Sequence, residues 1–205
     1  MNSPLLKLFT DPTDAWIEIR RAEEDHPQQY LPRLLLLLAL IPALCLLVGT
    51  TTYGWSLAGE DRVRLSLASA AQLAGLLYAT TVGGVMLMGV MIRWMSRGFD
   101  VQPNLNQCIG FAAYCATPWF VAGVVGLLPM RWLALLALLA ASAYASVLLY
   151  GGLQTFLRLR KEQAMLFATC VWGVGLLLLV TILVAMILFW SNGLMPEYVR
   201  PASLG

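Results

Sequence analysis

Five long apolar stretches, separated by short polar segments, fill most of the 205-residue chain, at about 34–52, 66–92, 106–128, 132–153 and 165–190. A helix needs about 20 apolar residues to cross a hydrocarbon core of about 30 Å. None of the stretches contains an aspartate, glutamate, lysine, arginine or histidine. The pattern predicts an all-α polytopic membrane protein with five transmembrane helices and no charged group inside them.

The lysine and arginine residues are distributed unevenly between the two sides that these spans define. The side of the N-terminus carries nine of them, Lys7, Arg20, Arg21, Arg33, Arg93, Arg97, Arg158, Arg160 and Lys161. The other side carries four, Arg62, Arg64, Arg131 and Arg200. Basic residues favour the cytoplasmic side. We therefore expect a cytoplasmic N-terminal segment (1–33), a five-helix domain (34–191) and an external C-terminal tail (192–205).

The N-terminal segment has the pattern of a short amphipathic helix. Asp11 is a good N-cap residue and Pro12 suits the first helical position. Trp16 and Ile19 would share one face of this helix. One interpretation places the helix on the cytoplasmic membrane surface, with Trp16 among the lipid headgroups. The other is a solvated helix packed on the loops, and the pattern leaves both open.

The third apolar stretch contains the most informative polar cluster, with a proline at membrane depth. Pro118 removes one helical hydrogen bond and crowds the carbonyl of Tyr114, so a kink is expected. Hydroxyl groups could supply a partner for that carbonyl. The predicted polar seam comprises Gly110, Tyr114, Thr117, Pro118, Thr80, Thr81, Tyr144 and Ser146. It is either a path for a small solute or lipid headgroup or, as we favour, hydrogen bonding around a structural kink.

Small residues recur at spacings that bring helices together. The second span has Gly75, Ala79, Gly83 and Gly84, and the fourth has Ala137, Ala141 and Ala145. Small side chains let helix backbones approach closely in lipid. A subunit interface and ordinary packing within one chain both fit this pattern, and the second is the more common use.

The chemistry-bearing residue types are placed in ways that argue against several functions. All four cysteines fall inside predicted spans rather than in loops, which does not suit a disulfide framework. The sole histidine, His26, has no neighbouring ligand set, so we expect no metal and no cofactor. Hydrolase, zinc-protease, P-loop and Rossmann motifs are missing from the sequence. The scattered basic residues predict no nucleic-acid partner.

Several segments, in their order and spacing, resemble the Ypt-interacting protein (Yip) domain family, in particular its short bacterial inner-membrane branch, often called YohC-like. They are Asp11-Pro12, Trp16 and Ile19, then Ile41-Pro42, then Gly110 to Tyr114 with Thr117-Pro118. The resemblance implies a five-helix fold, a cytoplasmic N-terminus and a location in the bacterial inner membrane. Eukaryotic relatives act with small GTPases, but this chain has only about 30 residues ahead of the membrane, so no GTPase partner is expected. The family provides no catalytic residues.

These observations lead to one favoured function and one alternative. We favour a non-enzymatic membrane protein that organises or adapts the membrane through homo-oligomerisation and contacts with membrane lipids. Arg93, Arg97, Arg158, Arg160 and Lys161 would hold anionic headgroups, although solvated anchors on the positive side fit them equally well. The alternative is a transporter or channel for a small solute, ion or lipid through the seam of the third span.

Overall fold

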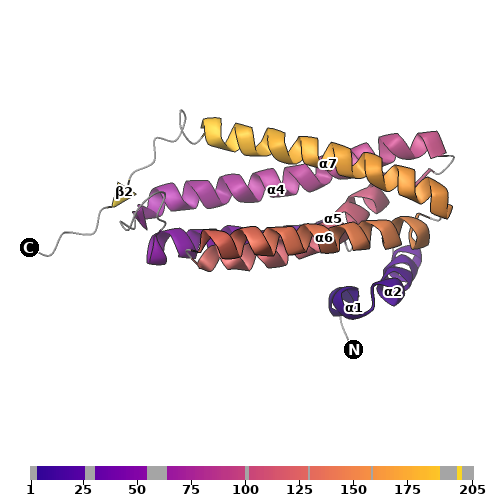
Figure 1. Ribbon diagram of the computed structural model, residues 1–205, viewed down its shortest axis with the longest axis horizontal. Coiled ribbons are helices and arrows are strands. Elements are labelled where there is room, and N and C mark those ends of the chain that lie inside the picture. The colour runs from indigo at the N-terminus through magenta and orange to yellow at the C-terminus, as the bar shows by residue number, and fades with distance from the viewer. Residues whose placement is uncertain are drawn as a thin grey trace, which may run out of the picture.

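The computed structural model describes residues 4–25, 31–54, 64–99, 102–128, 130–157, 159–189 and 198–199. The structure contains five long helices, and Figure 1 shows the long helices lying side by side. They are α3 (Leu31–Val48), α4 (Leu67–Ser96), α5 (Leu105–Ala122), α6 (Arg131–Thr155) and α7 (Lys161–Phe189). All five are long and apolar enough to cross a membrane. The predicted number of spans and the helical fold class are confirmed.

The observed spans agree with the predicted ones to within a few residues at most ends. They cover Leu35–Tyr53, Leu67–Phe99, Leu105–Leu127, Trp132–Thr155 and Lys161–Phe189. The largest differences are that the second continues through Phe99 and the fifth begins at Lys161. The second continues because α4 leads into a short 3-10 turn, η2 (Arg97–Phe99), which keeps the chain helical past its basic end. Helix length therefore exceeds the apolar stretch that predicted it.

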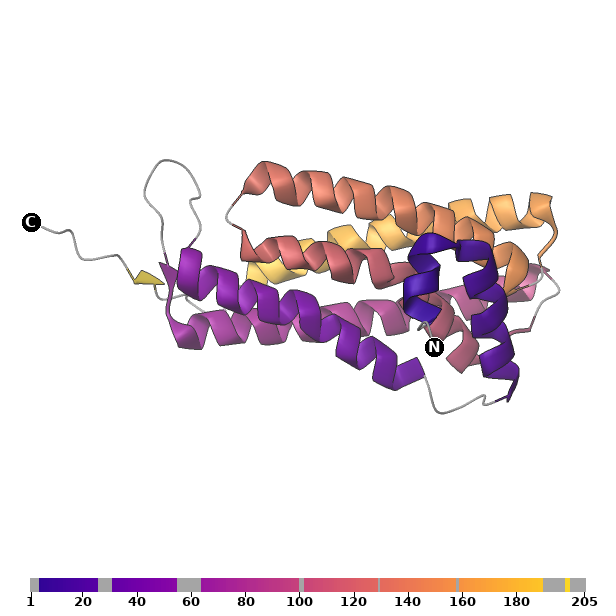
Figure 2. The same cartoon turned by 90° about the horizontal axis from the view of Figure 1, so that it is seen from below.

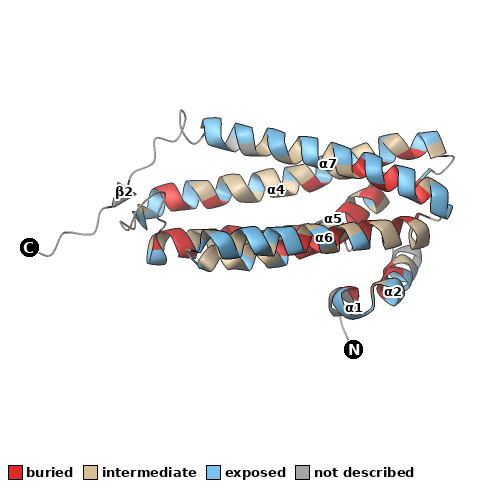
Figure 3. Cartoon of the chain, viewed as in Figure 1, coloured by how far each residue is buried: buried red, intermediate tan, exposed pale blue. Residues whose placement is uncertain are grey.

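Helix α5 lies at the centre of the bundle, while α7 lies at its edge. In the most apolar stretch of α5, half of the residues are buried, whereas in that of α7 only 6% are buried. The most extensive helix contacts join α4 to α5, α3 to α4 and α5 to α6. In Figure 3 the outward faces of the long helices are mostly exposed or half-buried. These exposed faces are apolar, as expected for surfaces that meet lipid.

Two glycines allow helix backbones to come very close. A Cβ at Gly89 of α4 would lie 2.7 Å from the Cα of Ile109 on α5. Gly123 begins the 3-10 turn η3 (Gly123–Leu127), and a Cβ there would lie 2.9 Å from the Cα of Pro42 on α3. Any larger side chain would push the helices apart. These contacts fix the separation of α3, α4 and α5.

A π-helical turn and a pair of short strands lie at the end of the bundle where α3 ends. Helix α3 continues into a π-helical turn, η1 (Gly49–Tyr53), which ends at Gly54 with φ of 69°. Strands β1 (Arg64–Leu65) and β2 (Tyr198–Val199) form an antiparallel pair, with Arg64 opposite Val199. This pair joins the segment after α3 to the C-terminal segment, and the sequence pattern did not predict it.

Two further helices, α1 (Pro4–Thr10) and α2 (Pro12–Asp25), pack against the side of the bundle. Figure 2 shows them lying across the long helices, with α2 nearer the end of the bundle and α1 further in. The backbone N–H of Asp14 donates to the Asp11 carboxylate at 3.3 Å. The predicted start of this helix, with Asp11 as the cap and Pro12 in the first position, is confirmed. We call α1 and α2 together the N-terminal hairpin.

Candidate functional site

Trp16 is the centre of the contact between the N-terminal hairpin and the spans. Its side chain is fully buried. The indole ring lies 5.2 Å from the ring of Phe111 and 6.1 Å from that of Tyr114, both on α5. It also lies 5.9 Å from the ring of Phe156, at the end of α6. Such aromatic clusters gain about 0.5–1.5 kcal/mol per pair beyond the burial of area.

Gly152 on α6 provides the space that the indole occupies. A Cβ at this position would come within 2.7 Å of two carbons of the Trp16 ring and 2.5 Å of Phe111. Only a glycine permits this approach without displacement. The indole Nε1 is buried and has no hydrogen-bond partner among the described residues. The contact between the Trp16 side chain and the spans therefore depends on shape and apolar burial.

Tyr144 holds α1 against the middle of α6. Its hydroxyl donates a hydrogen bond of 2.7 Å to the backbone carbonyl of Leu8. Its ring stacks on Phe9 with a centroid distance of 5.6 Å and an angle of 8° between the planes. Leu8 itself is fully buried. Helix α1 is thus fixed to the bundle by a polar and an aromatic contact from one residue.

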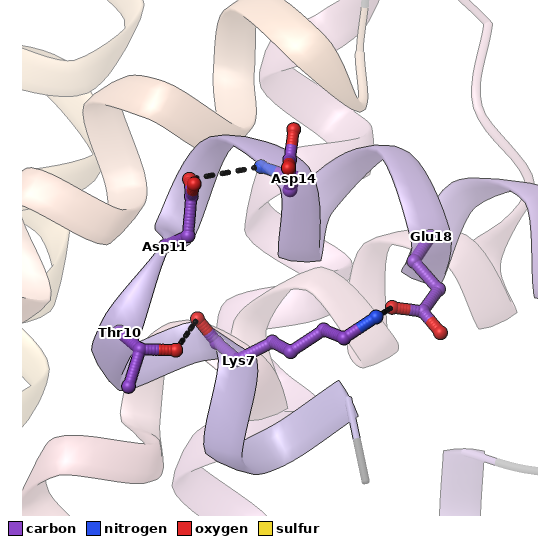
Figure 4. A network of polar contacts seen from close by, with 5 residues as sticks. All are labelled: Lys7, Thr10, Asp11, Asp14 and Glu18. Carbon is purple, nitrogen blue, oxygen red and sulfur yellow. Dashed lines mark hydrogen bonds and ion pairs between the residues drawn. The ribbon is translucent and has the colours of Figure 1, made fainter. Parts of the chain in front are cut away.

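An ion pair joins the two helices of the hairpin, and Figure 4 draws it together with polar contacts inside each helix end. The Lys7 ammonium on α1 lies 2.6 Å from the Glu18 carboxylate on α2. The Thr10 hydroxyl lies 3.5 Å from the Lys7 carbonyl, at the limit of a hydrogen bond. At the other edge of α2, the Arg20 guanidinium donates to the Thr155 carbonyl at 3.2 Å. The ion pair therefore holds α1 against α2, and the Arg20 hydrogen bond attaches α2 to the end of α6.

A small surface cavity lies where α2 meets the end of α6. Its volume is about 180 Å³, and it is lined by Ile17, Arg20, Arg21 and Thr155. Two adjacent arginines beside an exposed apolar residue suit contact with an anionic group at a membrane edge.

These contacts correct the prediction for Trp16. One of the two interpretations placed its side chain among the lipid headgroups, but it is fully buried against α5 and α6. The face shared by Trp16 and Ile19 does exist, since both side chains are buried. The amphipathic pattern was right, but its apolar face packs on the spans themselves rather than on lipid or on the loops.

The predicted polar seam is only partly assembled. Gly110, Tyr114, Thr117 and Pro118 are all buried in α5, which runs on as a helix to Ala122. The Thr117 hydroxyl lies 3.3 Å from the Ala113 carbonyl, and those of Thr81 and Ser146 donate to carbonyls one turn back in their own helices. The Thr80 hydroxyl lies 2.8 Å from the Leu76 carbonyl. Tyr144 turns away to Leu8. This arrangement favours local helix bonding over a continuous polar path.

The small residues of α4 and α6 behave differently. Ala141 and Ala145 of α6 are buried and Ala137 is half-buried, as packing within one chain requires. Gly75, Ala79 and Gly83 of α4 are instead exposed, and a Cβ at either glycine would meet nothing within 4 Å. This face of α4 therefore makes no close contact at either glycine within the single chain. Gly84 differs from these two glycines, because a Cβ there would lie 3.1 Å from the side chain of Ile182 on α7.

The predicted headgroup residues lie at the end of the bundle where α4 ends and α7 begins. Arg93, Arg97, Arg160 and Lys161 are exposed. Trp94 is also exposed, to 67%, as an interfacial anchor would be. Arg158 lies outside the described residues. Arg20 and Arg21 of α2 line a cavity at the last residue of α6 and so add to this basic edge.

Sequence reasoning missed three residues of the contact with Trp16, namely Phe111, Gly152 and Phe156. The one available signal was the Gly151-Gly152 pair inside an otherwise apolar stretch, because glycine in a helix interior costs about 1 kcal/mol relative to alanine. Among the described residues, no group of three His, Cys, Asp or Glu side chains could hold a metal ion.

The sequence comparisons identify the family that shares this architecture. The model of the Yip1 domain family matches residues 6–190, nearly the whole chain and all five spans. The chain belongs to the Yip1 domain family. This confirms the predicted resemblance.

Named relatives from two Escherichia coli strains agree with this. The chain is 36% identical to inner membrane protein YohC of strain K12 over 186 residues, which cover 91% of this chain and 95% of the relative. The protein of the same name from strain O6:H1 matches to the same extent. No solved structure matches the chain. Together with the five spans, these relatives confirm a multi-pass protein of the bacterial inner membrane.

Proposed function

We propose that this Yip1-domain protein is a non-enzymatic organiser of the bacterial inner membrane, acting through lipid contacts and self-association. The observation that carries the proposal is the contrast between a buried central helix and outer helices whose apolar side chains are exposed. Half of the residues in the most apolar stretch of the central helix α5 are buried, whereas α7 and the outer face of α4 expose apolar side chains on the outside of the bundle. A protein built this way makes most of its contacts with lipids or with other membrane helices.

The orientation that we propose places the N-terminal hairpin in the cytoplasm and the C-terminal segment outside. The excess of lysine and arginine on the side of the hairpin supports it. Labelling of single cysteines introduced at Arg64 and at Arg160, in a chain whose four native cysteines are replaced by alanine, from either side of an intact membrane, tests it. Residue 64 should react from outside and residue 160 from inside, and the reverse result contradicts the proposal.

Self-association would use the exposed face of α4 formed by Gly75, Ala79 and Gly83. Its spacing of four residues is the small-xxx-small pattern of closely packed membrane helices. Replacing Gly83 with leucine should abolish chemical crosslinking between copies in native membranes. Gly173→Leu on α7 is the matched control, because Gly173 is also exposed and also has nothing within 4 Å of an added Cβ. A wild-type protein that yields only monomers contradicts this part.

Anionic lipids would gather at the basic edge formed by Arg93, Arg97, Arg160 and Lys161, and the sequence adds Arg158 to this predicted headgroup set. Each such residue is worth about 1 kcal/mol near an anionic surface. Thermal stability should rise when phosphatidylglycerol replaces phosphatidylcholine, and this rise should shrink when Arg160 and Lys161 become glutamine. An equal melting temperature in both lipids contradicts the headgroup role.

The role itself is tested by reconstitution of the full chain into vesicles. A membrane organiser should change the size or shape of the vesicles, as seen by electron cryomicroscopy, without allowing solutes to pass. The hydrogen bonds of Thr81, Thr117 and Ser146 stay within their own helices, which does not favour transport through the seam. Solute flux that is lost on Tyr114→Phe would reverse this preference. Vesicles unchanged by the protein contradict the organiser role.

A further inference from the structure

We infer that the N-terminal hairpin is inserted into a single leaflet of the membrane, with α1 among the acyl chains and α2 at the level of the headgroups. The interaction partner of the outer surface of α1 is then lipid hydrocarbon, and that of α2 is the headgroup layer. This deepens the proposed function, since it names the part of the protein that would act on the membrane. The places where the hairpin contacts α6 support this position.

The contacts between the hairpin and α6 occur at increasing depth. Arg20 binds the carbonyl of Thr155, the last residue of α6. Trp16 packs at Gly152, three residues or about 5 Å further in. Leu8 is bonded to Tyr144, which lies nine residues or about 14 Å inside Leu153, the end of the apolar stretch. Half of a hydrocarbon core is about 15 Å thick. The hairpin therefore extends from the edge of the membrane through one leaflet.

The arrangement of the two helices gives the same order of depth. In Figure 2, α2 lies nearer the end of the bundle and α1 lies further along the spans. Packed helices are separated by about 8–10 Å. That places α1 about one helix diameter deeper than α2, within the acyl chains. The apolar side chain of Phe9 is 42% exposed there and would meet lipid.

The charges of the hairpin are arranged as this depth requires. Lys7 is the only charged residue of α1, and its ammonium is paired with Glu18 of α2 at 2.6 Å. A lone ammonium at this depth would be costly, while a paired one is tolerated. Helix α2 carries Asp14, Glu18 and Arg21 at spacings that place them on one polar face, and Asp11, directly before the helix, lies on the same side. Charged side chains of this kind need the hydrated headgroup layer and would be costly among the acyl chains.

Insertion on one side only would make the protein wider in that leaflet. Among the described residues, no helix other than the five spans lies along the opposite half of the bundle. A molecule with this taper takes up more area in one leaflet than in the other. It would favour curved membrane or impose curvature, which is how it would organise lipid.

Lipids that carry a photoreactive diazirine test the inserted position in the intact, reconstituted protein. With the diazirine in the middle of the acyl chain, we expect labelling at Phe9 and at Leu177 of α7, which is 71% exposed and serves as the internal reference. With the diazirine on the headgroup, labelling should move to the edge at Arg21. Labelled Leu177 with unlabelled Phe9 in acyl-probe vesicles overturns the inference.

A pair of variants shows whether the bundle holds the hairpin in place. Trp16→Ala should reduce acyl labelling at Phe9 several-fold relative to Leu177, whereas Trp16→Phe should retain it. Equal labelling in all three proteins contradicts an anchor at Trp16. These tests distinguish a failure of the inserted-hairpin inference from a failure of the proposed organiser role. Labelling at Phe9 with unchanged vesicle shape refutes only the organiser role, and altered vesicles without labelling at Phe9 refute only the inserted hairpin.

Discussion

Trp16 fits against Gly152 so closely that a single methyl group on the glycine would lie 2.7 Å from the indole ring. This pair joins an N-terminal helix to the fourth span, 136 positions later in the chain. The neighbouring Gly151 has nothing within 4 Å of an added Cβ. The chain thus offers two adjacent glycines on one helix, of which only one contacts the hairpin.

Gly152→Ala should therefore destabilise the protein, whereas Gly151→Ala should not. The added methyl group must displace two rings, and overpacking of this kind costs about 1–3 kcal/mol. Alanine at position 151 should be neutral or slightly stabilising, because alanine exceeds glycine in helix propensity by up to about 1 kcal/mol. The two melting temperatures, measured in the same detergent, give the comparison. Equal values would mean that the indole does not occupy the space beside Gly152.

Tyr144→Phe should loosen α1 while leaving the rest of the bundle intact. The variant loses the hydrogen bond to the Leu8 carbonyl, worth about 0.5–1.5 kcal/mol, and keeps the ring that stacks on Phe9. Hydrogen exchange at the α1 amides, followed by mass spectrometry, should become several times faster. Tyr150→Phe is the matched control on the same helix, since no hydrogen bond of the Tyr150 hydroxyl is observed among the described residues. Faster exchange in the control as well would point to a general loss of stability.

The number and approximate limits of the spans could be predicted because they depend on a local property, the length of uncharged apolar sequence. The start of α2 was also predictable, since the Asp11 cap and Pro12 act within one turn. The partner of Trp16 was not predictable. An apolar face on a short helix fits lipid or protein equally well, and only the fold brings residue 16 to residues 111, 152 and 156.

The small residues of α4 also show that the sequence does not predict which neighbour a helix face contacts. Spacing alone placed Gly75, Ala79 and Gly83 on one face of α4, and it cannot say which way that face turns. The structure turns it outward and uses Gly89, two residues off the predicted four-residue spacing, for the close contact with α5.

Gly89→Ala should consequently cost more stability than Gly83→Ala. At position 89 the new methyl group would lie 2.7 Å from the backbone of Ile109, which cannot move without shifting α5, so a loss of about 1–3 kcal/mol is expected. At position 83 the methyl group enters open space. Thermal unfolding of both variants in one detergent provides the test. A more harmful substitution at 83 than at 89 would show that α4 is rotated differently about its axis.

The ion pair between Lys7 and Glu18 should respond to mutation in a way that distinguishes lipid from water around it. A pair on a water-exposed surface contributes about 0–1 kcal/mol, and removing either partner has little effect. In a leaflet, each single substitution leaves an unpaired charge. The cost should be about 1–2 kcal/mol, less than for a fully buried pair, because the exposed parts of the two side chains (39% and 46%) would reach the hydrated headgroup layer beside α2. Replacing both residues with methionine removes both charges together. Lys7→Met and Glu18→Met should therefore each accelerate hydrogen exchange in α1, and the double variant should restore it towards the wild-type rate. Additive effects of the two substitutions, or effects abolished by high salt, would place the hairpin in water.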